Sequence, residues 1–197
     1  MSYSYRCIKQ QIYTAGRYSI VPIRMEDRYL IMQWRNEQIY HLRQNKPLTN
    51  EDQDRYFETV VASLFDQKQP AQILFSFLEE DKCVGYGGLV HINWIDRNAE
   101  LSFIMDTTLE ADFFEPYWTI FLKLIEVVAF KEIGLHKIFT YAFDLRPNVY
   151  SVLENNAFKK EATLKEHCCI NGEFLDVIIH SKIFQENKNQ NQTKQNA

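Results

Sequence analysis

A histidine and a glutamate on two neighbouring strand-like segments are the first residues whose types and spacing could do chemistry. Alternation along 83–94 and 98–105 gives each segment two faces. If the hairpin between them turns on Ile95 and Asp96, His91 falls directly across from Glu100. An imidazole beside a carboxylate can relay a proton, whereas a change of one residue in the turn would put the two on opposite faces. The alternative is a cross-strand polar pair that only satisfies itself on a half-exposed sheet.

A second group of chemistry-bearing residues ends a helical stretch over 25–36. Arg35 and Asn36 carry donors that could contact a phosphate or carboxylate of a bound molecule. The alternative is structural: Trp34 lies in the core, Arg35 packs on it, and Asn36 caps the end of the helix. Both interpretations stay open at the level of sequence.

Composition and charge exclude several classes of protein. The chain has 197 residues, of which 46% are hydrophobic and 24% charged, and its net charge is −4. This predicts one globular domain with no basic field to attract nucleic acid or a membrane surface. The four cysteines lack zinc-site spacing, so no metal is expected. The longest apolar region, 118–130, contains Lys123 and Glu126 and is too short to span a bilayer. We therefore predict a cytoplasmic protein with reduced thiols.

The elements that must position these residues follow from periodicity and turn signals. Residues 1–17 are predicted to be an N-terminal extension, 18–184 the folded domain and 185–197 a disordered polar tail. The predicted elements are a strand at 18–24, a helix at 25–36, a helix from 49 or 50 with a capping box of Asn50 and Gln53, and strands at 72–78, 83–94 and 98–105. They continue with a helix at 115–133, a strand at 137–143, a helix with Pro147 in its first turn, and strands at 160–170 and 174–183 joined by a turn at Asn171 and Gly172. The strand–helix–strand unit around the long helix implies a parallel pair. The predicted fold class is α/β, with a mixed, mostly antiparallel twisted sheet flanked by helices.

This order of elements resembles the GNAT superfamily of acyl-CoA-dependent N-acetyltransferases over about residues 18–184. Within it, the chain looks closest to the branch with ribosomal-protein-alanine and nucleotide-amino-sugar acetyltransferases. Three stretches carry the resemblance: WRN at 34–36, GYGGLVHINWIDRNAELSFIMD at 85–106 and VLENNAF at 152–158.

The resemblance implies acetyl-CoA as co-substrate, no metal, and a role for each residue that matches a family motif. Glu100, with His91, would act as the base. The donor would lie against Ile104, Met105, Asp106, Trp118, Thr119 and Arg146, and the acceptor against Trp34, Arg35 and Asn36.

The sequence departs from the family pattern where the family binds the CoA diphosphate. Members use a glycine-rich loop that opens the long helix, whose backbone N–H groups cradle the phosphates. Here the corresponding stretch is DFFEPYW, with Pro116 and Trp118 at the glycine positions. Leu153 stands where many members have a tyrosine acid; Tyr150, one turn earlier, could replace that tyrosine or simply pack.

The leading prediction is an N-acetyltransferase that moves an acetyl group from acetyl-CoA to a primary amine. A nucleotide-linked amino sugar or another small amine is the preferred acceptor class. Two alternatives remain: a protein N-terminal acetyltransferase acting on a peptide N-terminus, and a non-catalytic GNAT-fold binding module, which the altered loop would favour. Edge strands near the C-terminal end permit a homodimer by analogy.

Overall fold

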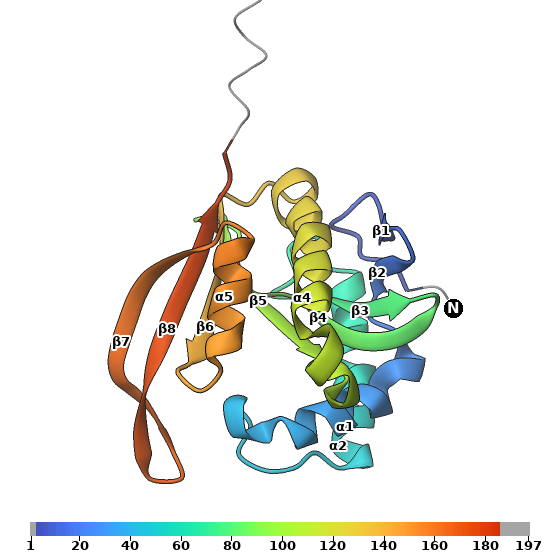
Figure 1. Cartoon of the computed structure of the whole chain (residues 1–197). Helices are drawn as coiled ribbons and strands as arrows, with labels where there is room; N and C mark the ends of the chain where they lie inside the picture. Colours follow the sequence, from blue (N-terminus) through green and yellow to red (C-terminus); the bar gives the residue numbers. More distant parts are fainter. Residues whose placement is uncertain (1–2, 186–197) are drawn as a thin grey trace, which may run out of the picture.

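The computed structural model describes residues 3–185, which form an eight-stranded sheet with helices on both faces (Figure 1). The strand order is β1-β2-β3-β4-β5-β6-β8-β7, and every neighbouring pair is antiparallel except β5 and β6, which are parallel. The predicted fold class and the predicted parallel pair are confirmed. The strands are β1 (Tyr13–Ala15), β2 (Tyr18–Pro22), β3 (Ile73–Glu79), β4 (Lys82–Asn93), β5 (Asn98–Met105), β6 (Lys137–Phe143), β7 (Lys159–Ile170) and β8 (Glu173–Ile183).

The helical segments lie between the strands where the periodicity predicts them. They are η1 (Met25–Asp27), α1 (Arg28–Glu37), η2 (Ile39–His41), α2 (Asn50–Arg55), η3 (Tyr56–Val61), α3 (Ala62–Phe65), η4 (Thr107–Leu109), α4 (Glu110–Glu126), η5 (Val127–Glu132) and α5 (Pro147–Asn155). Segments η1, η2 and η4 are 3₁₀ turns, while η3 and η5 are π-helical continuations of neighbouring helices. None of these helices, within residues 3–185, is long and apolar enough to cross a membrane.

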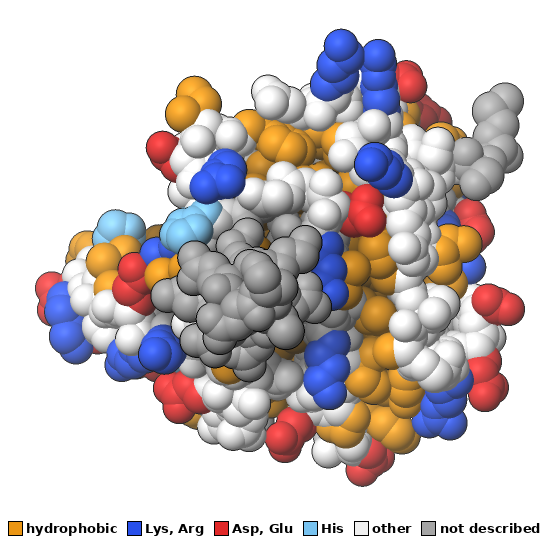
Figure 2. All heavy atoms as spheres, turned by 90° about the horizontal axis from the view of Figure 1, so that it is seen from above, with side chains coloured by type: hydrophobic (Ala, Val, Ile, Leu, Met, Phe, Trp, Pro, Cys, Tyr) orange, Lys and Arg blue, Asp and Glu red, His pale blue; other side chains and the backbone are white. Residues whose placement is uncertain are grey.

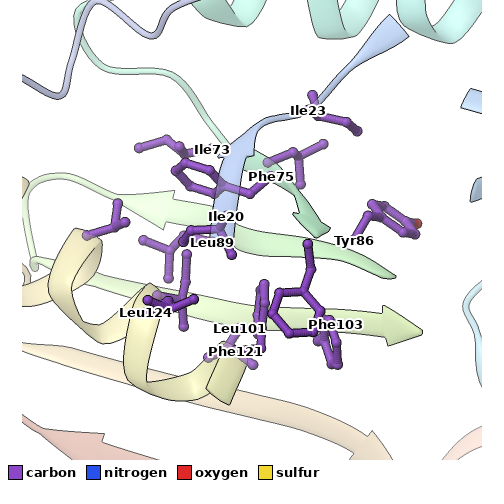
Figure 3. Close-up of a cluster of buried hydrophobic side chains, with 14 of the residues drawn as sticks. Ile20, Ile23, Ile73, Phe75, Tyr86, Leu89, Leu101, Phe103, Phe121 and Leu124 are labelled. Atoms are coloured by element: carbon purple, nitrogen blue, oxygen red, sulfur yellow. The ribbon is translucent and has the colours of Figure 1, made fainter. Parts of the chain in front are cut away.

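The two faces of the sheet are covered by different helices because side chains alternate along each strand. Phe103 of β5 stacks on Phe121 of α4 with ring centroids 4.2 Å apart, so α4 covers one face (Figure 3). Tyr86 of β4 pairs with Ile104 of β5, and because Ile104 follows Phe103, both point to the opposite face of the sheet. There the Tyr86 hydroxyl accepts a hydrogen bond from Arg35 of α1 at 2.7 Å. Helix α1 therefore lies on the other face.

The centre of the sheet is narrow because β4 carries glycines where aromatic rings pack. A Cβ atom added at Gly87 would lie 2.2 Å from the Ser102 carbonyl oxygen and 3.0 Å from Phe121. Only a residue without a side chain allows α4 to approach β4 this closely. The GYGG stretch noted in the sequence is thus required by the close approach of the neighbouring strands β3 and β5, and at Gly87 also of Phe121 from α4.

Residues 3–17, the described part of the predicted N-terminal extension, are packed on the domain. Residues 13–15 form β1 at the edge of the sheet, and Tyr5 is 1% exposed. The Tyr5 hydroxyl donates to the Leu74 carbonyl oxygen and accepts from the Leu74 N–H, both at 2.9 Å. This segment has no hydrophobic periodicity, so its order was not predictable from sequence; the order comes from the pairing of β1 with β2 and from the burial of Tyr5. The predicted disordered tail lies outside the described residues, apart from Gln185.

The long helix begins earlier than predicted. The sequence predicts a start near Glu115, yet α4 starts at Glu110 and runs continuously from the η4 turn. Pro116 lies inside the helix and removes one of its backbone hydrogen bonds. The packing of the buried face of α4 on the sheet compensates for the loss of this bond. The stretch DFFEPYW is therefore helical from end to end.

Of three other predictions about turns and caps, the structure confirms two and corrects one. Pro147 is the first residue of α5, as predicted. Asn171 and Gly172 join β7 and β8 with φ values of 52° and 87°, which confirms the predicted turn. The predicted capping box of Asn50 and Gln53 is wrong by one residue: Thr49 caps α2 and Asp52 reciprocates.

The surface carries charges of both signs. On the face seen in Figure 2, acidic and basic side chains are interspersed among apolar ones. This visible part of the surface has no continuous field of one sign.

Candidate active site

A cavity of about 410 Å³ opens where β5 and β6 part. The two strands pair only over Asn98–Glu100 and Lys137–Phe139, and then separate. Beyond that point the flanks are the loop His41–Arg43 after α1, the start of α5 at Arg146 and the ring of Trp118 from α4. The site is thus a product of strand divergence, which no local sequence signal encodes.

Glu100 lies in the wall of this cavity and is 8% exposed. Its Oε1 atom accepts from Arg43 Nη2 at 2.5 Å, and its Oε2 atom lies 2.8 Å from His91 Nδ1. Because a carboxylate accepts hydrogen bonds, the proton of a neutral His91 belongs on Nδ1. That leaves His91 Nε2 with a lone pair that can take a proton from a bound amine.

His91 reaches Glu100 by a route that differs from the predicted one. Near the turn Asn93 pairs with Asn98, but one bulge further along, Val90 and not His91 stands directly opposite Glu100. His91 occupies the bulge with a left-handed φ of 50°, which turns its ring toward the carboxylate. The predicted contact is present, although the predicted register is wrong.

Arg43 and Tyr141 complete this part of the cavity, and sequence reasoning missed both. The guanidinium of Arg43 lies 4.5 Å from the centre of the Tyr141 ring while it binds Glu100. Burial raises the pKa of the Tyr141 hydroxyl, so it keeps its proton at neutral pH. Arg43 follows a short irregular segment and lies 57 residues from Glu100. No spacing rule connects such residues.

Of the three predicted acceptor residues, only Arg35 lines the cavity. Trp34 is 2% exposed in the core. Asn36 holds the loop after α1, since it donates to the Leu48 carbonyl oxygen and accepts from the Leu48 N–H. Trp34 is therefore a core residue, as in the structural alternative, and Asn36 anchors a loop.

Arg35 has polar partners but no carboxylate. It donates to the Tyr86 hydroxyl at 2.7 Å and to Gln44 Oε1 at 3.1 Å, and no acidic side chain in the described part of the chain forms an ion pair with it. Its guanidinium stays cationic in the cavity wall. Such a group is available to a bound anion.

The predicted donor residues fall into two groups. Ile104, Trp118 and Arg146 line the cavity, whereas Met105, Asp106 and Thr119 do not. Trp118 packs edge-on against Phe103 with centroids 5.1 Å apart. Thr119 instead accepts a hydrogen bond from Asn156 at 3.1 Å and is not among the lining residues. Tyr150 is also outside the lining, with its hydroxyl 3.0 Å from Asp144 Oδ1. Burial, followed by Asp144, raises the pKa of that hydroxyl.

Backbone groups of β5 face the gap where β6 has departed. The Asp106 N–H donates to the Val84 carbonyl oxygen of β4 at 2.9 Å. Because bonding direction alternates along an antiparallel strand, the N–H of Ile104 also faces β4, and those of Phe103 and Met105 face the gap. An extended chain with amide groups, such as the pantetheine arm of acetyl-CoA, can use such an unpaired strand edge.

The comparisons with known proteins agree with this geometry. The family model described as "Acetyltransferase (GNAT) domain" matches residues 20–179. The chain belongs to the GNAT acetyltransferase family. It is an acetyl-CoA-dependent N-acetyltransferase by that membership, and the resemblance in the sequence is confirmed. In the residues that the structure describes, no group of three metal-ligating side chains occurs.

Solved structures share the fold of this GNAT chain. A spermidine N-acetyltransferase from Vibrio cholerae, solved with CoA and spermine, has a TM-score of 0.73 at 18% identity, over 86% of this chain and 96% of that one. A protein described as a probable acetyltransferase has a TM-score of 0.70 at 18% identity, over 87% and 96% of the two chains. At these identities the likeness speaks for the fold alone.

Proposed function

We propose that this N-acetyltransferase acetylates the primary amine of a small molecule that also carries an anionic group, with a nucleotide-linked amino sugar as the leading class. The observation that carries this proposal is Arg35, a cation in the cavity wall that has no carboxylate partner among residues 3–185. A phosphate or carboxylate of the acceptor would supply that partner.

The charge of the cavity supports the same acceptor class. Its lining contains three arginines and two histidines, and Glu100 is the one carboxylate among them. Arg43 already neutralises Glu100. A polyamine, which is the substrate named for the Vibrio cholerae enzyme, carries only positive charge at neutral pH and would be repelled. We therefore infer a different acceptor for this chain.

The proposed reaction is direct transfer. His91 Nε2, oriented by Glu100, takes a proton from the acceptor ammonium, and the free amine attacks the thioester carbonyl carbon. The N–H groups of Phe103 and Met105 are the candidates to stabilise the developing oxyanion. The C–S bond then breaks, the nitrogen of the tetrahedral intermediate loses its extra proton, and the departing thiolate takes a proton. Tyr141, the one phenol among the lining residues, is the residue to test as the donor to the thiolate, and the proton lost by the nitrogen restores its hydroxyl.

The deciding experiment compares acceptors in wild type and Arg35→Gln, with thiol release from acetyl-CoA as the readout. The panel is a UDP-linked amino sugar, spermidine, a short peptide with a free N-terminus, and a neutral amino sugar. We expect the anionic acceptor to react best, and Arg35→Gln to lower its kcat/KM by about 10- to 100-fold, as for loss of a charge-assisted bond of about 1.5–3 kcal/mol. The neutral amino sugar is the control and should be little affected.

Other results would redirect the proposal. Preference for the peptide would favour the N-terminal acetyltransferase, and preference for spermidine would contradict the anionic acceptor. Binding of acetyl-CoA without transfer to any acceptor would favour the non-catalytic module. A cytoplasmic location and a homodimer remain proposals; light scattering of the purified chain tests the latter.

A further inference from the structure

The start of helix α4 has almost no backbone donors left for a ligand. Asp106 Oδ1 accepts from the Thr108 N–H at 2.9 Å. The Leu109 N–H donates to the Asp106 carbonyl oxygen, and the Glu110 N–H to that of Thr107. A diphosphate at a helix N-terminus requires several uncommitted N–H groups pointing at it. Here the Asp106 cap and the 3₁₀ turn already occupy the N–H groups of Thr108, Leu109 and Glu110.

The same helix start is strongly acidic. Asp106, Glu110, Asp112 and Glu115 lie within ten residues of one another. Carboxylates stabilise a helix N-terminus but repel a second anion there. The one cation that pairs with any of these four carboxylates in the described residues, Arg146, binds Glu110 Oε1 at 2.8 Å.

A polar cluster beside the cavity connects the ends of four helices and strands. It consists of Gln38, His41, Glu110 and Arg146 and is here called the Arg146 cluster. Arg146 also bonds His41 Nε2 at 2.8 Å, and buried Gln38 donates to the Met105 carbonyl oxygen at 3.0 Å. Burial and the charge of Arg146 lower the pKa of His41 to about 4, so the ring is neutral and can accept from Arg146. The cluster joins the ends of α1 and β5 to the starts of α4 and α5, and two of its members, His41 and Arg146, line the cavity.

These observations do not fit the diphosphate of acetyl-CoA, although the gap between β5 and β6 fits the pantetheine arm. We propose that this enzyme recognises its donor by the acyl-pantetheine arm alone, and that the nucleotide half gains no binding at the start of α4. Selectivity for acetyl-CoA over simpler acyl-pantetheine thioesters is then lost. This inference rests on the proposed acetyl transfer, in which either donor exchanges a C–S bond for a C–N bond and releases its thiol.

The first test compares acetyl-CoA with S-acetylpantetheine, using the best acceptor of the panel above. We expect the two values of kcat/KM to agree within about fivefold. A preference for acetyl-CoA above about 100-fold would overturn the inference. Calorimetry with CoA and pantetheine gives a second readout that needs no acceptor: similar Kd values support the inference, and much tighter CoA binding, or no binding of pantetheine, contradicts it. Failure of transfer with both donors, while both bind alike, would count against the proposed function only.

The second test removes charge from the helix start without touching its caps. Asp112 is exposed and has no hydrogen-bond partner in the described structure, and Glu115 has only a 3.5 Å contact with Asn155. Asp112→Asn with Glu115→Gln should tighten CoA binding about 3- to 10-fold and leave pantetheine binding unchanged. Glu58→Gln, at an exposed helical position elsewhere, is the matched control. No gain for CoA in the double variant would refute the inferred repulsion.

Discussion

At the scale of single residues, the carboxylate of Glu100 organises the reactive part of the cavity. It is almost fully buried, yet both oxygens have nitrogen partners, Arg43 on one and His91 on the other. Burial of a carboxylate is tolerated when such partners satisfy it. The sequence singled out Glu100 and His91, but not the cation that makes this burial possible.

Glu100→Gln tests the proposed proton relay. The amide keeps the shape but cannot hold the positive charge that develops on His91, so we expect kcat/KM to fall about 10²- to 10⁴-fold. Steady-state kinetics from pH 6 to 9 check this, with circular dichroism to confirm folding. Near wild-type activity in Glu100→Gln would show that the pair is only structural.

His41 gives a pH dependence to stability. Its pKa is about 4 in the folded chain and about 6.5 when unfolded, so the unfolded state binds more protons between these values. Stability is therefore full above pH 6.5 and declines as the pH falls toward 4. Between pH 7 and 5, wild type should lose about 1 kcal/mol more than His41→Gln, after allowance for the partial exposure of His41. Urea unfolding at both pH values measures the difference; equal losses would show that His41 is not the titrating group.

At the scale of elements, the separation of β5 from β6 creates the cavity. Helix α4, which packs closely on the sheet, contributes Trp118 to the cavity wall. The alternation, lengths and turns of these elements were predictable from local patterns. The early start of α4 was not, because Pro116 and the acidic first turn read as a helix boundary, whereas packing of Phe121 and Trp118 on the sheet carries the helix through the proline.

Gly87→Ala tests the close packing of β5 and α4 against β4. The new Cβ would meet the Ser102 carbonyl oxygen at 2.2 Å, so we expect a loss of about 2–4 kcal/mol in the free energy of unfolding. Thermal and urea unfolding give the value. Gly16→Ala is the matched control, because its Cβ would meet no atom within 4 Å and only its φ of 62° opposes the change; it should cost about 1 kcal/mol. Equal costs would contradict the steric explanation.

At the scale of the whole molecule, the N-terminal segment and the sheet form one unit. Tyr5 packs on Phe65 and Phe75 while its hydroxyl bridges both polar groups of Leu74. The core thus joins the first described residues to a strand almost seventy positions later. The N-terminal segment, α3 and β3 therefore stabilise one another.

Tyr5→Phe and Tyr5→Ala measure this coupling. Loss of the hydroxyl leaves the buried Leu74 N–H unpaired, while the Leu74 carbonyl oxygen still accepts from the Ile23 N–H, and should cost about 1–3 kcal/mol. Loss of the ring as well should cost about 3–5 kcal/mol. Tyr40, which is 51% exposed, provides the control, since Tyr40→Phe should change stability by less than about 0.5 kcal/mol. Unchanged unfolding midpoints in both Tyr5 variants would restore the view of a loose extension.

The sequence by itself determined the class of fold, the order of the elements, the acetyltransferase family and the pair Glu100 and His91. These depend on alternation, helical periodicity, turn residues and motifs, which act over a few neighbouring positions. Only the tertiary structure decided that Arg43 holds Glu100, that a bulge turns His91 toward it, and that no acidic side chain of the described residues pairs with Arg35. It also decided that Asp106 caps the start of α4 and that Arg146 binds Glu110 there. Each of these depends on groups brought together from distant positions by the packing of helices on a diverging sheet, and local sequence patterns carry no record of such distances.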